Sequence, residues 1–288
     1  MPHPVFEIIE PGIAATLQDR GRVGWRRFGV PPGGVMDEHA AFWANRLLDN
    51  APDAAVAEFL LQGAKLRALR ETWIALSGAA AANVPSWRAV KMSKGEMIEF
   101  PTSHSGVWIY LAVEGGFAGT RLLGSVSVYG RGQLGRPFFR GDLLCRSASA
   151  DFELPTGVAG RVVDRNEQRN YDAPPALRVW RGPQWSSFSD GDREVFFAQE
   201  WTVSSQSDRV GYRLTGTPLR PSEAQIVSEP VLVGTIQVTT NGLPIVTMRD
   251  GPTVGGYPKL GLVDAADVSW LAQCRPGVKV RFELARHS

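Results

Sequence analysis

The sequence of 288 residues has little of what several large classes of protein depend on. Lysine and arginine exceed aspartate and glutamate by only two, and no basic run is longer than two residues. The positive stripe that nucleic-acid binding needs is therefore missing. No apolar run approaches a membrane span, and the N-terminus lacks the basic and apolar regions of a signal peptide. These features predict a soluble, cytoplasmic protein that binds neither nucleic acid nor membrane.

Cysteine and histidine are also scarce. The two cysteines, Cys145 and Cys274, lie far apart in the sequence, which favours buried free thiols in a reducing compartment over a disulfide. The four histidines never approach one another or a cysteine at the spacing of metal ligands. No metal site is predicted.

The sequence lacks the phosphate-binding loop G-x-x-x-x-G-K-[ST]. Gly130–Gly135 matches the pattern G-x-G-x-x-G, but Arg136 and Pro137 follow it instead of a helix start, so a glycine turn is favoured over a nucleotide site. Any ATP site is therefore atypical or lies in a partner. Lys91 has only one of the two methionines that flank the lysine of a biotin carrier, which predicts a surface lysine and no attached biotin.

Glycine and proline, in contrast, are abundant, with 31 and 20 residues, which is typical of short strands joined by tight turns. Strand-length runs of β-branched and aromatic residues predict a mainly β fold of barrels or sandwiches. The clearest runs are residues 72–76, 107–113, 177–180 and 278–282. Apolar residues at helical spacing predict short helices at Asp37–Leu48, with Asp37 as the cap, and at Ala266–Cys274.

The length predicts two domains of medium size rather than one. Residues 161–175 are charged, poor in large apolar side chains and close to turn formers, which indicates a linker. The predicted N-terminal lobe is therefore 1–160 and the predicted C-terminal lobe 176–288. Each lobe contains strands and a helix.

Residues 228–258 carry the most informative pattern in the chain. Val231–Val238 and Leu243–Met248 predict two strands, and Asn241-Gly242 between them is a strong hairpin signal. Polar side chains near strand ends and a pair of glycines favour a substrate-binding surface over a tight turn with an aromatic plug. The residues of this predicted surface are Gln237, Asn241, Thr253, Gly255, Gly256 and Tyr257.

A catalytic base is harder to identify. Asp250 lies next to the predicted surface and is the candidate, because Asp37 is better explained as a helix cap. The other carboxylates considered are Asp19, Glu58 and Asp208.

Two charged segments have more than one interpretation. Arg22, close to Asp19, either binds a substrate carboxylate or braces a glycine loop. Ser207, Asp208 and Arg209 belong either to a site, to a structural ion pair or to an interface between lobes or subunits.

Ordered blocks along nearly the whole chain resemble the family of 5-oxoprolinase C subunits, also called KipI antagonists or allophanate hydrolase subunit 2. That family is similar to the biotin-dependent carboxyltransferase part of urea carboxylase. The blocks are Thr16–Gly24, Gly29–Asp37, Ala44-Asn45, Asn50, Tyr110–Gly116, Leu123–Ser127, Gly182–Gln184, Ser207–Leu214, Ser228–Pro258 and Gln273–Phe282.

The resemblance implies two cyclophilin-like β-barrel lobes with a few short helices. It also implies one component of a hydrolase that works with two partner proteins, one like the A subunit and one like the B subunit (KipI-like). The three share ATP to open 5-oxoproline to L-glutamate. Leu243 and Pro252 stand where glutamine is common in the family, which leaves the substrate open.

Two alternatives remain from other classes. One is a carboxyltransferase component that acts on a urea-like or amide substrate with a separate biotin carrier. The other is a non-enzymatic antagonist of a kinase-inhibitor partner.

Overall fold

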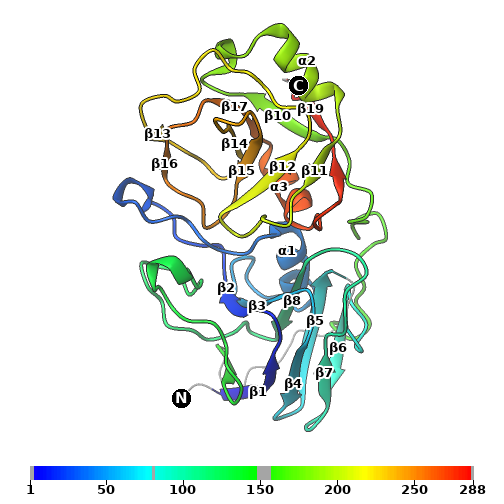
Figure 1. Cartoon of the computed structure of the whole chain (residues 1–288). Helices are drawn as coiled ribbons and strands as arrows, with labels where there is room; N and C mark the ends of the chain where they lie inside the picture. The colour runs from blue at the N-terminus through cyan, green and yellow to red at the C-terminus, as the bar shows by residue number, and fades with distance from the viewer. Residues whose placement is uncertain (1–2, 80–81, 148–156, 287–288) are drawn as a thin grey trace. The chain divides into compact units, whose positions relative to one another are not determined.

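The computed structural model describes residues 3–79, 82–147 and 157–286 (Figure 1). The chain divides into two compact units. Unit 1 is Met1–Val23 with Gly33–Asn170, and unit 2 is Gly24–Pro32 with Tyr171–Ser288. In the described residues, strands predominate and three short α-helices accompany them, which confirms the predicted mainly β fold class.

Unit 1 consists of two antiparallel sheets, with strand orders β7-β4-β1-β9 and β2-β3-β8-β5-β6. Its strands are β1 (His3–Pro11), β2 (Ala15–Gln18), β3 (Val56–Leu60), β4 (Ala64–Ala68), β5 (Thr72–Gly78), β6 (Arg88–Met92), β7 (Met97–Glu99), β8 (Trp108–Val113) and β9 (Leu143–Arg146). The runs predicted at 72–76 and 107–113 are β5 and β8.

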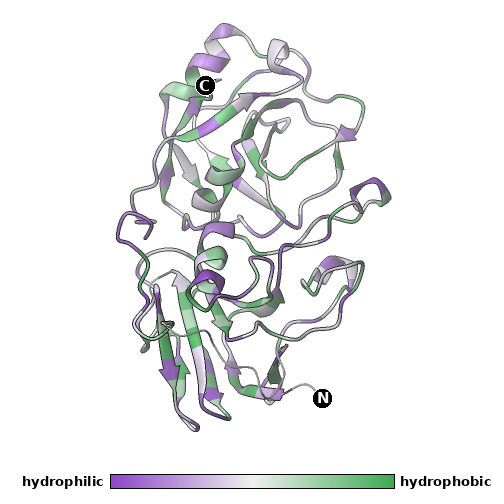
Figure 2. Cartoon of the chain, turned by 180° about the vertical axis from the view of Figure 1, so that it is seen from behind, coloured by the Kyte–Doolittle hydropathy of each residue, from purple (hydrophilic) through white to green (hydrophobic). Residues whose placement is uncertain are grey.

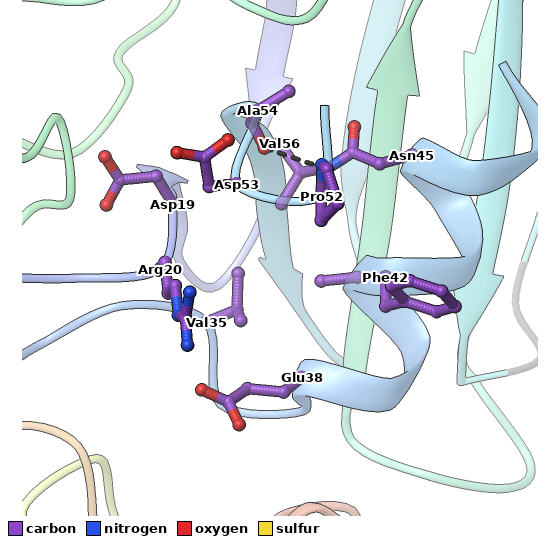
Figure 3. Close-up of a pocket in the computed structure, with 11 residues that line it drawn as sticks. Asp19, Arg20, Val35, Glu38, Phe42, Asn45, Pro52, Asp53, Ala54 and Val56 are labelled. Carbon is purple, nitrogen blue, oxygen red and sulfur yellow. Dashed lines mark hydrogen bonds between the residues drawn. The ribbon is translucent and has the colours of Figure 1, made fainter. Parts of the chain in front are cut away.

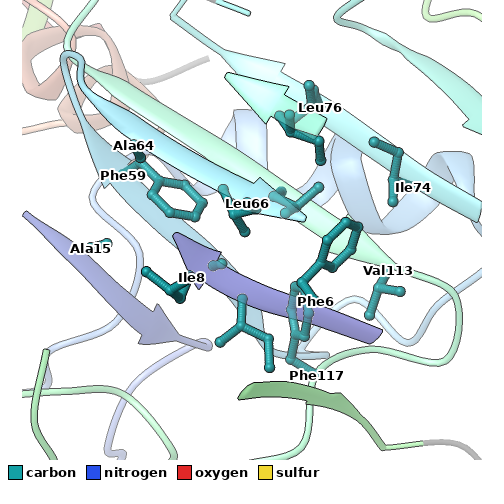
Figure 4. Packing of buried hydrophobic residues seen from close by; sticks show 14 of the residues in the cluster. Phe6, Ile8, Ala15, Phe59, Ala64, Leu66, Ile74, Leu76, Val113 and Phe117 are labelled. Carbon is teal, nitrogen blue, oxygen red and sulfur yellow. The ribbon is translucent and has the colours of Figure 1, made fainter. Parts of the chain in front are cut away.

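Apolar side chains of unit 1 gather in one buried cluster (Figure 4). Phe6 and Ile8 of β1 are two residues apart and therefore lie on the same face of the strand. They join Leu66 of β4 and Phe59 of β3, whose ring centroid lies 4.9 Å from that of Phe100. Figure 2 shows hydrophobic and hydrophilic residues mixed along the strands, as expected for sheets with one buried face. Burying each of these apolar side chains stabilises the folded state by roughly 1.5–3 kcal/mol.

Helix α1 (Glu38–Leu47) confirms the helix predicted at 37–48. The Asp37 carboxylate accepts a hydrogen bond from the Ala40 amide at 3.0 Å, which is the predicted cap. Ser77 of β5 donates its hydroxyl to the Ala40 carbonyl at 2.6 Å. This contact ties the start of α1 to β5.

Unit 2 contains an eight-stranded sheet in the order β18-β11-β12-β15-β14-β17-β10-β19 and the two-stranded pair β13-β16. Its strands are β10 (Leu177–Arg181), β11 (Trp201–Val203), β12 (Gly211–Thr215), β13 (Glu229–Pro230), β14 (Thr235–Val238), β15 (Pro244–Thr247), β16 (Val254–Gly255), β17 (Lys259–Val263), β18 (Lys279–Val280) and β19 (Phe282–Leu284). The run predicted at 177–180 is β10.

The single strand predicted at 278–282 is wrong, because the chain forms two strands there with only Arg281 between them. Strand β18 pairs with β11, whereas β19 pairs in parallel with β10 at the other end of the sheet. Strands adjacent in sequence thus occupy opposite ends of the sheet, so the sheet curls into a nearly closed barrel.

Unit 2 has two helices. Helix α3 (Ala265–Ala272) agrees with the prediction at 266–274 within two residues, and Asp264 caps it by accepting from the Ala266 amide at 3.1 Å. Helix α2 (Asp190–Ala198) was not predicted. It begins with a capping box, in which the Asp192 amide donates to the Ser189 hydroxyl at 3.1 Å. Its Phe196 stacks on Phe282, with ring centroids 4.9 Å apart.

The two cysteines are free thiols; Cys274 is buried as predicted, whereas Cys145 is only half-buried. Burial raises the pKa of the Cys274 thiol to about 12. In the described part of the chain, no helix has the length and apolar character needed to cross a membrane.

Candidate functional site

A cavity of about 440 Å³ lies in unit 1, beside the end of β2 and one face of α1 (Figure 3). Its size falls within the usual range for small-molecule sites. Its lining comprises Asp19, Arg20, Val35, Glu38, Ala41, Phe42, Asn45, Pro52, Asp53, Ala54 and Val56.

Asp19 is buried at one wall of this cavity, and its carboxylate is fully used inside the protein. It accepts hydrogen bonds from the Gly21 amide at 2.8 Å, the Val126 amide at 2.9 Å and the Ser127 hydroxyl at 2.6 Å. The Ser125 hydroxyl donates to it as well. Two hydroxyls and two amides donate to this one carboxylate, so Asp19 anchors the loop at residues 125–127.

Arg22 braces the same loop. Its side chain is buried, with Nε donating to the Leu122 carbonyl at 3.2 Å and Nη2 donating to the Ser127 carbonyl. Of the two interpretations of Arg22, these contacts favour the bracing of a glycine-containing loop. Arg22 lies in unit 1, whereas the other predicted site residues lie in unit 2.

The backbone of Arg20 is held by the loop that leads into α1. The Val35 amide donates to the Asp19 carbonyl at 3.0 Å. Gly34 has φ of +90°, and a Cβ at that position would lie 3.0 Å from the carbonyl carbon and oxygen of Arg20. Only glycine allows this left-handed conformation and this close approach together. The glycine block before α1 therefore positions one edge of the cavity.

The opposite edge is held by two asparagines. Asn45 of α1 donates its side-chain amide to the Ala54 carbonyl at 2.8 Å. Asn50 donates to the Asn45 side-chain oxygen at 3.1 Å and accepts from the Gly115 amide at 2.8 Å. Together with the hydrogen bond from the Ala54 amide to the Ala51 carbonyl, these contacts fix the short loop that carries Asp53.

A buried polar network lies at the start of α1. The Tyr110 hydroxyl donates to Glu58 Oε2 at 2.9 Å and accepts from the Asp37 amide at 2.8 Å. The Met36 amide also donates to Glu58 Oε2, at 2.8 Å. Burial first, and then the nearby charges of Glu58 and Asp37, raise the pKa of Tyr110 well above its usual value of 10. The considered carboxylates Glu58 and Asp37 thus hold the loop before α1 in place.

In unit 2, the predicted hairpin is confirmed as β14 and β15, but β14 begins at Thr235 rather than at Val231. Gly234 has φ of +88°, which ends the extended conformation before the strand. Asn241 is exposed in the turn, where its side-chain oxygen accepts from the Leu243 amide at 3.2 Å and from the Thr239 hydroxyl. Asn241 thus closes the hairpin through its own contacts.

The glycine pair of the predicted surface packs against neighbouring parts of unit 2. A Cβ on Gly255 would lie 2.4 Å from Gln237 Oε1, and a Cβ on Gly256 would lie 3.1 Å from the Ile226 carbonyl. Gln237 is buried and donates to the Thr247 hydroxyl at 3.0 Å. Gln237 and Gly255 are therefore brought together, and internal packing explains why glycine stands at Gly255. Thr253 and Tyr257 are half-buried beside them.

Lys259 is the residue of this region that sequence reasoning missed. Its side chain is 3% exposed, and its Nζ lies 2.9 Å from Glu229 Oε1, 3.4 Å from the Gly255 carbonyl and 3.5 Å from the Tyr257 carbonyl. The hydrogen bond from Lys259, followed by one from Gln184 at 2.8 Å, holds the pKa of Glu229 below its usual value. A buried lysine thus links β13 to the Gly255–Tyr257 loop. No local sequence signal marks Lys259, because its burial depends on Glu229, which is distant in the sequence.

The candidate base Asp250 forms an ion pair with Arg209. Arg209 Nε lies 2.8 Å from Asp250 Oδ2, and Nη2 lies 3.1 Å from Oδ1, which is a bidentate arrangement. Asp208 accepts from the Val210 amide at 2.8 Å, and Ser207 accepts from the Arg213 amide at 3.0 Å. These contacts join the turn before β12 to the loop after β15. Within the described residues, no group of three or more histidines, cysteines or carboxylates is arranged to hold a metal ion.

Comparison with known proteins gives consistent results. The model of the carboxyltransferase domain, subdomain A and B, matches residues 28–284. The C subunit of 5-oxoprolinase from Escherichia coli (strain K12) is 32% identical over 290 residues, covering 96% of this chain and 90% of that protein.

Solved structures agree with these matches. The structure of TTHA0988 superposes with a TM-score of 0.86 at 32% identity over 98% of this chain, which spans 55% of that chain. The urea carboxylase of Kluyveromyces lactis superposes with a TM-score of 0.85 at 27% identity over 98% of this chain, which spans 27% of that chain.

Proposed function

The chain belongs to the carboxyltransferase domain family, and within it to the group of 5-oxoprolinase C subunits, and from this membership we propose that it is one subunit of an ATP-dependent 5-oxoprolinase complex. The complex opens the lactam of 5-oxoproline to give L-glutamate. One observation carries the proposal, namely 32% identity to the Escherichia coli protein over 90% of its length. The partners are two proteins like the A and B subunits of that complex.

The chemistry explains why a complex with ATP is needed. A lactam carbonyl is a poor electrophile, and ATP would activate it by transferring a phosphoryl group to the carbonyl oxygen, with ADP as the leaving group. Water would then add to the carbonyl carbon, provided that fixed donors stabilise the charge that develops there. The ring C–N bond would break as the nitrogen takes up a proton, and hydrolysis of the resulting acyl phosphate would release phosphate and the new carboxylate of glutamate. In this proposal, the contribution of the chain is to bind and orient the lactam.

The proposal places the ATP site wholly or partly in the partner subunits. Gly130–Gly132 forms a single 3₁₀ turn, and the Tyr129 and Leu134 backbones pair across it. In residues 133–147, which the structure describes, no helix begins after this turn, so the turn lacks the aligned amides that hold a triphosphate. Lys91 of β6 is half-exposed and lies 2.7 Å from Glu71, so the proposal also assigns no attached biotin to this chain.

A second candidate function is a carboxyltransferase component that acts on a urea-like or amide substrate with a separate biotin carrier. The similarity to the Kluyveromyces lactis urea carboxylase favours this candidate, because that match extends over 98% of the chain with a TM-score of 0.85. The ureido ring of biotin is itself a cyclic amide, so both candidates need a site for the same kind of group.

Reconstitution with the two partner proteins separates these candidates. We expect the complex to release phosphate from ATP and glutamate from 5-oxoproline, and the isolated chain to release neither, because it lacks a phosphate loop. The assay uses a panel of lactams and ureas, with and without a biotin carrier.

Turnover of the lactam by the chain alone would contradict this division of labour. Activity on ureas that depends on the carrier, with none on 5-oxoproline, would replace the first candidate with the second.

A further inference from the structure

Two charged groups lining the unit 1 cavity differ from the rest. The Asp19 carboxylate and the Asn45 amide are already occupied by contacts within the protein. Among the described residues, the side chains of Arg20 and Asp53 form no hydrogen bond and no ion pair. The cavity therefore offers one uncommitted cation and one uncommitted anion.

Both groups stand on backbone that is held in place. Arg20 is fixed by the close approach of Gly34 and by the hydrogen bond from the Val35 amide to the neighbouring Asp19 carbonyl. Asp53 lies on the loop that Asn45 and Asn50 hold. The family-like blocks between Thr16 and Asn50 thus contribute to the frame of this cavity. The backbone at both positions is therefore fixed at the edge of the cavity, and only the two side chains have to be ordered when a ligand binds.

The cavity walls add an apolar part. Val35, Phe42 and Val56 line it, and Phe42 remains 42% exposed although it is aromatic. In Figure 3, the charged ends of Asp19, Arg20, Asp53 and Glu38 gather on one side of the cavity, while Phe42 and Pro52 lie on the other. Such a division suits a compact ligand with a polar edge and a hydrocarbon body.

We propose that this cavity binds a small molecule that carries a carboxylate beside an N–H group, with the Arg20 guanidinium pairing with the carboxylate and the Asp53 carboxylate accepting the N–H. An α-amino acid and its cyclic lactam share this chemistry. A guanidinium matches a carboxylate through two parallel hydrogen bonds. Glu38 and Asp53 repel a simple anion, so the N–H group is what selects the ligand.

Only the choice of 5-oxoproline as the first probe rests on the proposed function. The test is an NMR titration of the full chain, without ATP or partners, with L-5-oxoproline, L-glutamate and L-proline as the arms that separate the lactam from free amino acids. The matched probes 2-pyrrolidinone, which lacks the carboxylate, and acetate, which lacks the N–H, complete the set. We expect saturable shifts around Arg20 and Asp53, and at least about tenfold weaker binding of both incomplete probes.

Two substitutions test the assigned groups. Arg20→Ala and Asp53→Asn each raise the dissociation constant at least about tenfold, equivalent to 1.4 kcal/mol or more. Arg140→Ala is the matched control, because Arg140 is exposed in unit 1 and does not line the cavity. Thermal melting of each variant checks that the fold is retained, since both targets are exposed side chains.

Three results overturn the proposal. The first is the absence of saturable binding of every ligand up to about 10 mM. The second is wild-type affinity in folded Arg20→Ala and Asp53→Asn variants. The third is loss of binding in Tyr257→Phe but not in Arg20→Ala. Failure of the proposed function can be distinguished from failure of the cavity proposal. A complex that turns over ureas only, with binding to the cavity intact, rejects that function alone. If the Arg20→Ala variant keeps full lactam turnover in the complex and binds the ligand unchanged, only the cavity proposal is rejected.

Discussion

Tyr110 is a buried side chain whose ionisation bears on stability. Its hydroxyl is fully buried and hydrogen-bonded to Glu58, so the neutral form is favoured in the folded protein and its pKa is raised well above 10. In the unfolded chain, the phenol ionises near its ordinary value. The stability from neutral Tyr110 is therefore fully present below pH 10 and is lost as the pH rises above 10 toward the folded pKa.

Tyr110→Phe tests this linkage. We expect the variant to be less stable than the wild type by about 1–3 kcal/mol at pH 8, because Glu58 loses a buried donor. The difference in free energy of unfolding between the wild type and the variant should narrow between pH 10 and pH 11, because the wild type loses the stability that neutral Tyr110 provides. Denaturant unfolding at each pH measures the gap, and Tyr129→Phe, at a half-buried tyrosine, is the control. A gap that stays constant up to pH 11 would show that the raised pKa is wrong.

At the scale of single elements, strand β16 needs a glycine at position 255 because no space is left for a side chain. A Cβ on Gly255 would meet Gln237 Oε1 at 2.4 Å and Val231 Cγ2 at 3.0 Å. Gln237 is buried and bonded to Thr247, so it has no free space to move into. We expect Gly255→Ala to cost about 1–3 kcal/mol through overpacking, measured by thermal unfolding.

A second substitution identifies the cause. Adding Gln237→Ala to Gly255→Ala removes the crowding atom, so the double variant should lose less than the sum of the two single variants. Gly130→Ala is the control, because nothing lies within 4 Å of its Cβ position. Strict additivity would exclude a direct contact between the two side chains.

Local patterns predicted the elements whose signals are local. The strands at 72–76 and 107–113 and the helix at 37–48 follow from side-chain period and a cap. Helix α2 was missed because Gly191 and its aspartates favour turns, although Ser189 and Asp192 are a capping pair. The split at Arg281 was missed because strand partners are chosen by contacts far apart in sequence.

In the candidate sites, too, the sequence does not reveal contacts between residues that are far apart in the chain. Residues 237–257 were recognised as a group because they are close in sequence, and the structure does bring Gln237 and Gly255 into contact. The burial of Lys259 depends on Glu229, thirty residues away, so the sequence alone indicates a solvated lysine. The placement of Arg20 and Asp53 on the lining of one cavity likewise comes from the fold.

For the whole molecule, the division of the chain gives a test. Gly24–Pro32 belongs to unit 2 although it lies between two parts of unit 1. In a fragment that ends at Asn170, we expect the amides of Gly24–Pro32 to exchange hydrogen freely, because their unit is absent, while β5 and β8 stay protected. Hydrogen exchange read by mass spectrometry compares the fragment with the full chain. Equal protection of Gly24–Pro32 in both would contradict its assignment to unit 2.

The placement of Gly24–Pro32 also matters during synthesis of the protein. The ribosome makes this segment about 140 residues before Tyr171, the next residue of its unit, and translation at roughly 5–20 residues per second makes the delay on the order of ten seconds. Strands of unit 1 form in microseconds to seconds once they are complete. The nascent chain therefore carries Trp25, which is half-buried in the complete protein, outside its finished unit during this interval.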